Sequence, residues 1–183
     1  AIGAGFIMAD VQLAAYRLAE FPVVAIASRT ADNARRVATR WSIPRVHETP
    51  LALIEDPEVD IVDIAFPPDQ QPPLIRAALA QPHVKGILAQ KPLAMDHREA
   101  ARLVAEAAAA GKALSVNQNM RFDQSMRVLK QLLERNALGT PVLATIEMRA
   151  IPHWQPFLRE YDRLTLLNMG IHHLDVLRFL FGE

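Results

Sequence analysis

The sequence predicts an α/β fold: a doubly wound parallel sheet, then the start of an α+β domain with a largely antiparallel open sheet. Short apolar runs alternate with helical segments through the first two thirds of the chain, as in strands covered by helices on both faces. After about residue 120 this rhythm stops, and residues 141–149 alternate apolar and polar side chains. We therefore place a first domain at residues 1–119 and the beginning of a second at residues 120–183.

The elements of the first domain follow from apolar runs and helix-start signals. Ala1-Ile2 has the character of the end of a strand whose beginning is missing, so we interpret the chain as part of a larger protein. Thr30, Thr49 and Asp96 each precede a helical segment as candidate N-caps, and Gly111 follows the last of these segments. We expect strands at 23–28, 61–65, 84–89 and 114–117, helices at 6–20, 30–41, 50–54, 74–79 and 96–111, and a proline-rich connector at 66–73.

The second domain is expected to begin with an amphipathic helix and a strand. We expect the helix at 124–134, a turn at 138–141, the strand at 141–149, an irregular loop at 150–163 and a final helix at 168–181. The alternation in the strand puts Val142, Ala144, Ile146 and Met148 on one face.

The composition excludes several classes of protein. Hydrophobic residues make up 51% of the chain and charged residues 22%, so a packed core is expected rather than disorder. Twenty basic residues balance twenty acidic ones without a basic block, so we expect neither a nucleic-acid nor a membrane partner. The lack of cysteine excludes disulfides and thiolate metal sites. It also fits a reducing compartment, and with no visible signal peptide or transmembrane segment we expect a cytoplasmic protein.

The chain opens with a glycine-rich turn between a strand and a helix, Gly3-Ala4-Gly5. In such a turn the first glycine permits the bend and the second lets the backbone approach a pyrophosphate, which the helix N-terminus then attracts. Met8 stands where the fingerprint has a third small residue, so an ordinary β–α turn is the alternative. Phe6 and Ile7, which begin the helix, would also lie against the cofactor.

The end of the second strand predicts which dinucleotide is bound. Ser28-Arg29-Thr30 contains no acid that could bind a ribose, whereas its hydroxyl groups and guanidinium suit a 2′-phosphate. We therefore expect NADP or NAD, with NADP preferred. The alternative is that Arg29 is a solvated loop residue and Thr30 only caps a helix.

Lys91 follows an apolar strand, at the sheet edge where doubly wound folds bind ligands. Partial burial would lower its pKa and allow proton exchange with a substrate hydroxyl. Pro92 fixes the backbone at this point, and a cis bond is one way to do so. Phe66, Pro67 and Gln71 follow the preceding strand and are expected at the same edge. A surface lysine at a strand end is the alternative.

The last helix carries a second group of polar residues. His172 follows Asn168 by four positions and precedes Asp175 by three, so all three share one helix face. His172 could accept a proton or orient a hydroxyl, or it could form a structural pair with Asp175. A third convincing metal ligand is missing, so we expect no metal. Asn119, Arg121 and Trp154 are further candidates near a ligand.

Together these residues resemble the glucose-fructose oxidoreductase and inositol dehydrogenase (Gfo/Idh/MocA) family along the whole chain. The resemblance rests on the Gly3-Ala4-Gly5 turn, Lys91-Pro92-Leu93-Ala94, and Gly170-Ile171-His172 through Asp175. It also includes 59–64, the segment up to Arg121, and 138–142.

The resemblance implies an N-terminal Rossmann domain, an NAD(P)-dependent oxidoreductase of sugars, cyclitols or related hydroxyl and carbonyl substrates, and a dimer or tetramer. It implies that Lys91 is the catalytic lysine and His172 the active-site histidine, with Asn168 beside it. The cofactor residues expected are Gly3, Gly5, Phe6, Ile7, Ser28, Arg29, Thr30, Phe66, Pro67, Gln71, Gln90, Lys91 and Asn119. The substrate residues expected are Lys91, Arg121, Trp154, Asn168 and His172.

Two positions depart from the family pattern. Gln90 stands where an acid usually precedes the lysine, and Asn168 stands where an aspartate usually precedes the histidine. An asparagine can position a hydroxyl but cannot take its proton. These departures favour an alternative, a non-catalytic regulatory or binding protein that senses dinucleotide. A glycosidase that oxidises its substrate transiently with bound NAD is a third possibility.

Overall fold

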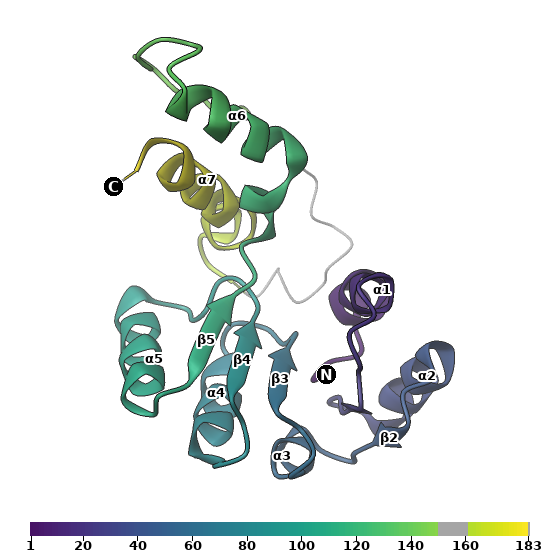
Figure 1. Cartoon of the computed structure of the whole chain (residues 1–183). Helices are drawn as coiled ribbons and strands as arrows, with labels where there is room; N and C mark the ends of the chain where they lie inside the picture. The colour runs from purple at the N-terminus through teal and green to yellow at the C-terminus, as the bar shows by residue number, and fades with distance from the viewer. Residues whose placement is uncertain (150–160, 183) are drawn as a thin grey trace. The chain divides into compact units, whose positions relative to one another are not determined.

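The structure is a computed structural model that describes residues 1–149 and 161–182. The chain divides into two compact units, Ala1–Asn117 and Gln118–Glu183. Figure 1 gives the order of the elements along the chain. Within the described residues, no helix combines the length and the apolar character needed to cross a bilayer.

The first unit contains a parallel sheet that is joined at its centre by a single residue. One part pairs β1 (Ala25–Ile26) with β2 (Arg45–Val46), and the other has the order β3 (Ile61–Ile64), β4 (Gly86–Ala89), β5 (Ala113–Val116). Ile2 forms parallel bridges to both Ala27 and Ile64, so it lies between the two parts. The strand order reverses at Ile2, which is the topological switch point of a doubly wound sheet. The expected fold class is confirmed.

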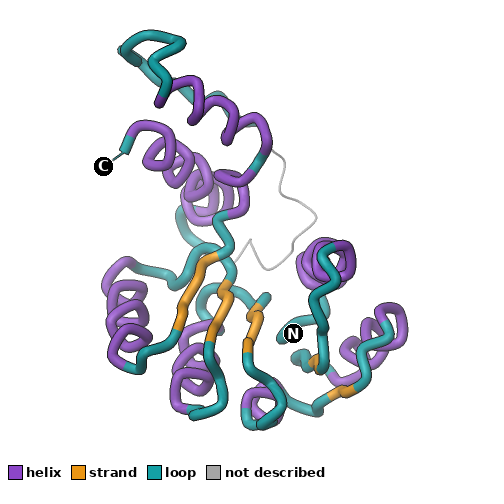
Figure 2. Tube along the Cα trace, viewed as in Figure 1, coloured by secondary structure: helices purple, strands orange, loops and turns teal. Residues whose placement is uncertain are grey.

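Helices alternate with these strands (Figure 2). They are η1 (Ile7–Gln12), α1 (Leu13–Leu18), α2 (Ala31–Trp41), α3 (Pro50–Ile54), α4 (Gln71–Ala80) and α5 (His97–Ala109). Two predicted caps are confirmed: Thr49 accepts a hydrogen bond from the N–H of Ala52, and Asp96 accepts from those of Arg98 and Glu99. Thr30 occupies the N-cap position of α2, but its side chain makes no capping bond.

One helix begins earlier than the sequence analysis expected. The segment 66–73 was expected to be a connector with the helix starting at residue 74, but α4 starts at Gln71. Pro72 and Pro73 therefore lie in the first helical turn, where proline is tolerated because the first N–H groups have no partner within the helix. The earlier start places Gln71 inside the fold instead of in a loop.

Two apolar clusters form the core of the first unit. Successive residues along β1 and just after it separate them: Ala25 of β1 and the following Ala27 belong to one cluster, and Ile26 of β1 belongs to the other. Side chains alternate between the faces of a strand, so the clusters lie on opposite faces of the sheet. The first cluster contains Leu53 of α3, Ile75 of α4 and Leu103 of α5. The second contains Met8 and Leu13 from the first helical segment and Val37 from α2.

A buried carboxylate ties the first helical segment to the sheet. Asp63 of β3 accepts hydrogen bonds from Gln12 Nε2 at 3.0 Å and from the Tyr16 hydroxyl at 2.6 Å. Burial raises the pKa of Asp63, while these two donors oppose the rise. We did not predict this cluster from the sequence, although a lone acid in an apolar strand is a signal that the acid needs partners.

The second unit is helical in its described part. It contains η2 (Asn119–Phe122), α6 (Gln124–Glu134), η4 (Leu166–Gly170) and α7 (Ile171–Phe181). The predicted bounds of α6 are confirmed. The strand expected at 141–149 is not formed, and Val142 is almost fully exposed. A strand exists only through hydrogen bonds to a neighbour, and in the described residues no strand pairs with this segment.

Candidate active site

The glycine turn follows Ile2 directly, at the switch point of the sheet. Gly3 has a positive φ of 120°, and a Cβ built there would lie 2.7 Å from the carbonyl oxygen of Ala65. Its own N–H donates to the carbonyl of Ala27 at 2.8 Å. The turn can therefore bring its backbone this close to β3 only with glycine at position 3.

Gly5, unlike Gly3, faces open space. It is exposed, and a Cβ built there would meet no atom within 4 Å. The helical segment begins two residues later at Ile7, and Phe6 before it is 55% exposed. An open backbone surface beside a helix N-terminus, at the switch point, fits the pyrophosphate of a dinucleotide.

Ser28, Arg29 and Thr30 connect β1 to α2. The Ser28 side chain is buried, and its Oγ accepts a weak hydrogen bond from the N–H of Thr30 at 3.4 Å. Arg29 and Thr30 are exposed. The Thr30 hydroxyl makes no bond to the helix that it precedes, so it is available to an external group.

Lys91 lies just beyond β4, where the ends of three strands meet. Ile64 pairs with Ala89 and Ala89 with Val116, so the residues that follow β3, β4 and β5 leave the same edge of the sheet. The Lys91–Pro92 peptide bond is cis. Burial lowers the pKa of Lys91 to about 8, so a substantial fraction of the amine is neutral near physiological pH. Phe66 and Pro67 are half-buried at the end of β3.

Gln71 lies against this segment from the start of α4. Its side chain is fully buried, and its amide hydrogen-bonds to the main chain of Gln90 and Pro92. From the sequence we expected Gln71 to contact the cofactor, and that contact remains a prediction. The contact with the Lys91 segment was missed, because it depends on the packing of α4 against β4.

Gln90 contributes a polar group that the protein does not satisfy. Its side-chain Nε2 is buried and has no hydrogen-bond partner in the described residues. A buried amide donor without a partner is costly, and such groups in native proteins are usually explained by a water or a ligand. This donor, next to Lys91, fits an acceptor group of a bound cofactor.

His172 and Asn168 belong to the second unit. His172 is buried in the first turn of α7, and Asn168 lies in η4 just before it. Asp175 is held by Arg121, which donates to both of its carboxylate oxygens. Arg121 was expected at the substrate; the structure shows much of its guanidinium engaged with Asp175. Asn119 begins η2 and is exposed.

Two further expectations concern Trp154 and metal ligands. Trp154 lies outside the described residues. In the part of the chain that the structure describes, no three His, Asp or Glu residues are grouped so as to hold a metal ion.

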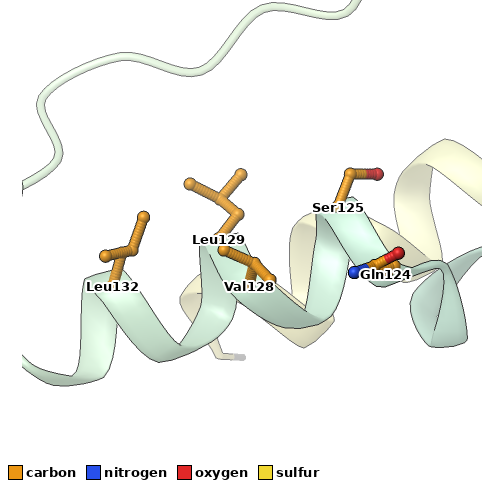
Figure 3. A pocket seen from close by; sticks show the side chains of 5 residues that line it. All are labelled: Gln124, Ser125, Val128, Leu129 and Leu132. Carbon is orange, nitrogen blue, oxygen red and sulfur yellow. The ribbon is translucent and has the colours of Figure 1, made fainter.

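One hollow is lined by the apolar face of α6. Gln124, Ser125, Val128, Leu129 and Leu132 line it, as Figure 3 shows. The lining includes no acid or base that could activate the Ser125 hydroxyl, so the hollow offers no chemistry of the kind proposed for Lys91 and His172.

The sheet, the glycine turn at its switch point and the strand-end lysine define a dinucleotide-binding α/β protein. A sequence profile described as "Oxidoreductase family, NAD-binding Rossmann fold" (GFO_IDH_MocA) matches residues 1–118. The chain belongs to this Gfo/Idh/MocA oxidoreductase family, as the resemblance implied.

Several similar proteins of known name are dehydrogenases. The chain is 31% identical over 164 residues to D-apiose dehydrogenase of Paraburkholderia graminis, a match that covers 88% of this chain and 43% of the relative. It is 30% identical over 163 residues to myo-inositol 2-dehydrogenase of Thermotoga maritima, which covers 87% of this chain and 47% of that relative. The chain thus spans about half the length of the curated relatives it matches.

Solved structures agree with the fold. An oxidoreductase from Agrobacterium radiobacter in complex with NAD+, L-tartaric acid and magnesium superposes with a TM-score of 0.88 at 28% identity. That match covers 100% of this chain and 54% of the other.

Proposed function

We propose that this chain is the cofactor-binding part of an NAD(P)-dependent oxidoreductase acting on a sugar, a cyclitol or a related hydroxyl or carbonyl compound. One observation carries the proposal: a partly buried lysine, Lys91, with a pKa lowered to about 8, lies at the strand ends of a sheet with a glycine turn at its switch point. The names of the relatives support the substrate class, since D-apiose and myo-inositol are polyhydroxy compounds.

The cofactor would be held by the residues that the sequence analysis selected. Gly3 permits the tight turn against Ala65, Gly5 leaves room for the pyrophosphate, and the buried Nε2 of Gln90 offers a hydrogen bond near Lys91. A bound nicotinamide supplies the acceptor or donor for hydride. In this proposal Gly3, Gly5, Phe6, Ile7, Phe66, Pro67, Gln71, Gln90, Lys91 and Asn119 all contribute to cofactor binding.

Lys91 handles the proton of the substrate hydroxyl. In its neutral form the amine accepts the proton when the hydroxyl is oxidised, and in its charged form it returns the proton to a carbonyl oxygen that is reduced. A pKa of about 8 populates both forms near neutrality, so one residue can serve both directions. His172 assists by orienting the hydroxyl, and Asn168 contributes a hydrogen bond in place of a carboxylate; Arg121 and Trp154 are proposed to contact the substrate.

The finer features are part of the same proposal. We propose a preference for NADP, supported by the exposed guanidinium of Arg29, the uncommitted hydroxyl of Thr30 and the absence of an acid at this turn. A cytoplasmic homo-oligomer, dimer or tetramer, is proposed from the lack of cysteine and from the family resemblance.

A non-catalytic dinucleotide sensor is the second candidate. The observation in its favour is that Gln90 and Asn168 replace the acids that the family resemblance leads one to expect. Such a protein would bind the cofactor through the same turn without net hydride transfer.

The test follows nicotinamide absorbance of the full-length protein with NAD and NADP against a panel of sugars and cyclitols. A Lys91→Ala variant is compared with Lys85→Ala, whose lysine is mostly exposed and pairs with Asp60. Turnover that disappears only in Lys91→Ala, with cofactor binding kept, supports the oxidoreductase. Tight binding with no turnover across the panel favours the sensor, and no binding of either nucleotide refutes both.

A further inference from the structure

Gln71 makes three hydrogen bonds to the main chain around Lys91. Its Nε2 donates to the carbonyl of Gln90 at 3.1 Å and to the carbonyl of Pro92 at 3.0 Å. Its Oε1 accepts from the N–H of Gln90 at 2.7 Å. The amide therefore holds the chain on both sides of Lys91 with a single rigid group.

These contacts use most of the hydrogen-bonding capacity of the Gln71 side chain. Both protons of the amide nitrogen are donated to the lysine segment, and the side chain is 0% exposed. Because Gln71 is fully buried and its bond to Pro92 lies in the interior, breaking these bonds leaves the carbonyl of Pro92 unsatisfied. The buried hydrogen bonds of Gln71 therefore hold the main chain at Lys91 more strongly than a contact at the protein surface would.

The fold also fixes the position of Gln71 itself. The carbonyl of Pro67 accepts from the N–H groups of Gln70 and Gln71, which starts α4 directly after the end of β3. Ile75, one turn further along α4, is fully buried in the core cluster that also contains Ala89 of β4. Because α4 fixes the position of Gln71, the hydrogen bonds of Gln71 also fix the loop that carries Lys91.

We propose that Gln71 is a positioning residue for Lys91, which keeps the lysine partly buried by anchoring the main chain on both sides of it. The role of Lys91 in the reaction rests on the proposed function, but its anchoring does not. Without the anchor the segment relaxes towards solvent, the burial that lowers the pKa of Lys91 decreases, and the amine is misplaced relative to a substrate.

The experiment replaces Gln71 by methionine, which has a similar length but no hydrogen-bonding amide. The matched control is Arg76→Met on the same helix. In the part of the chain that the structure describes, Arg76 pairs with Glu99 and Glu106 of α5 and not with the lysine segment. The pKa of Lys91 is read by NMR titration of the full-length protein after reductive ¹³C-methylation of its lysines, with Lys91→Arg to assign the resonance. This readout requires neither cofactor nor turnover.

We expect the pKa of Lys91 to rise by about half a unit or more in Gln71→Met and to stay unchanged in Arg76→Met. With substrate, kcat should fall by about 10- to 100-fold in Gln71→Met. If Gln71→Met does not fold, Gln71→Asn, which keeps the amide but is too short to reach both carbonyls, takes its place.

An unchanged pKa of Lys91 in the Gln71 variant, or an equal rise in Arg76→Met, would overturn the inference and leave Gln71 a purely structural residue. A wild-type protein without turnover would refute the proposed oxidoreductase, and the NMR titration would still decide the role of Gln71.

Discussion

Arg121 and Asp175 form a two-point ion pair that joins η2 to α7 in the second unit. Arg121 Nε donates to Asp175 Oδ2 at 2.7 Å, and Nη2 donates to the other oxygen. The Asp175 side chain is only 17% exposed, so removing the arginine leaves a largely buried carboxylate without its charged partner. We expect Arg121→Met to lower the free energy of unfolding by about 2 kcal/mol, measured by urea denaturation.

The control for this change is Arg127→Met, which removes an exposed arginine from α6. It should leave the free energy of unfolding within about 0.5 kcal/mol of the wild type. If Arg121→Met is equally stable and instead raises the KM for substrate, then substrate binding, not the tie to α7, is the main role of Arg121.

Gly3 and Gly5 should respond differently to the same substitution. A Cβ at Gly3 would clash with the carbonyl of Ala65 and demand an unfavourable φ, so we expect Gly3→Ala to destabilise the protein by about 2 kcal/mol or more. A Cβ at Gly5 meets nothing, so Gly5→Ala should keep the stability and weaken dinucleotide binding about 10-fold by occupying the space meant for pyrophosphate. Thermal unfolding and calorimetric titration of both variants check this pair.

Equal loss of cofactor binding and stability in both variants would contradict the assignment of separate roles. So would a Gly5→Ala protein that binds NAD and NADP as tightly as the wild type, because the open side of Gly5 would then face no ligand.

Arg29 should discriminate between the two dinucleotides. Its exposed guanidinium follows β1 beside the Thr30 hydroxyl, which makes no capping bond. Loss of an ionic partner of a phosphate commonly costs about 1.5–3 kcal/mol, so Arg29→Gln should weaken NADP binding about 10- to 100-fold and leave NAD binding nearly unchanged. Arg36→Gln, which also removes an exposed arginine, from within α2, is the control. Equal affinities of the wild type for NAD and NADP would remove the basis of this prediction.

Much of the fold could be predicted because its signals are local. Apolar runs identified β1, β3, β4 and β5 but missed the short β2 at Arg45–Val46. Thr49 and Asp96 marked helix starts that the hydrogen bonds confirm. The partial strand at Ile2 was recognised from its place before the glycine turn, and its bridges to Ala27 and Ile64 show it at the centre of the sheet.

The features that sequence reasoning missed depend on contacts between distant segments. Gln71 reaches the chain around Lys91 only because α4 packs beside β4, and neither segment encodes that contact alone. The strand expected at 141–149 shows the converse: its alternation is a local pattern, but a strand also requires a partner. Residue chemistry led to the prediction that Lys91 is catalytic, whereas the position of Lys91 depends on packing that the sequence pattern does not state.

The pH dependence of the reaction should reverse with its direction. Burial lowers the pKa of Lys91 to about 8, so the neutral amine that oxidation requires is the minor form at pH 7. We expect kcat/KM for oxidation of a hydroxyl to rise about 10-fold per pH unit up to about pH 8 and then level off. For reduction of a carbonyl, which requires the charged ammonium, kcat/KM should instead be constant at low pH and fall above about pH 8.

Two variants separate Lys91 from other groups that titrate in this range. Lys91→Arg keeps the positive charge but cannot release a proton. We therefore expect kcat to fall about 10²- to 10⁴-fold for both oxidation and reduction, and the change in rate near pH 8 to vanish. His172→Asn removes the imidazole and should keep this change near pH 8, although it lowers the rate. If the change in rate near pH 8 survives in Lys91→Arg and disappears in His172→Asn, then His172 and not Lys91 moves the proton. The group that moves the proton must be the one whose removal abolishes the pH dependence.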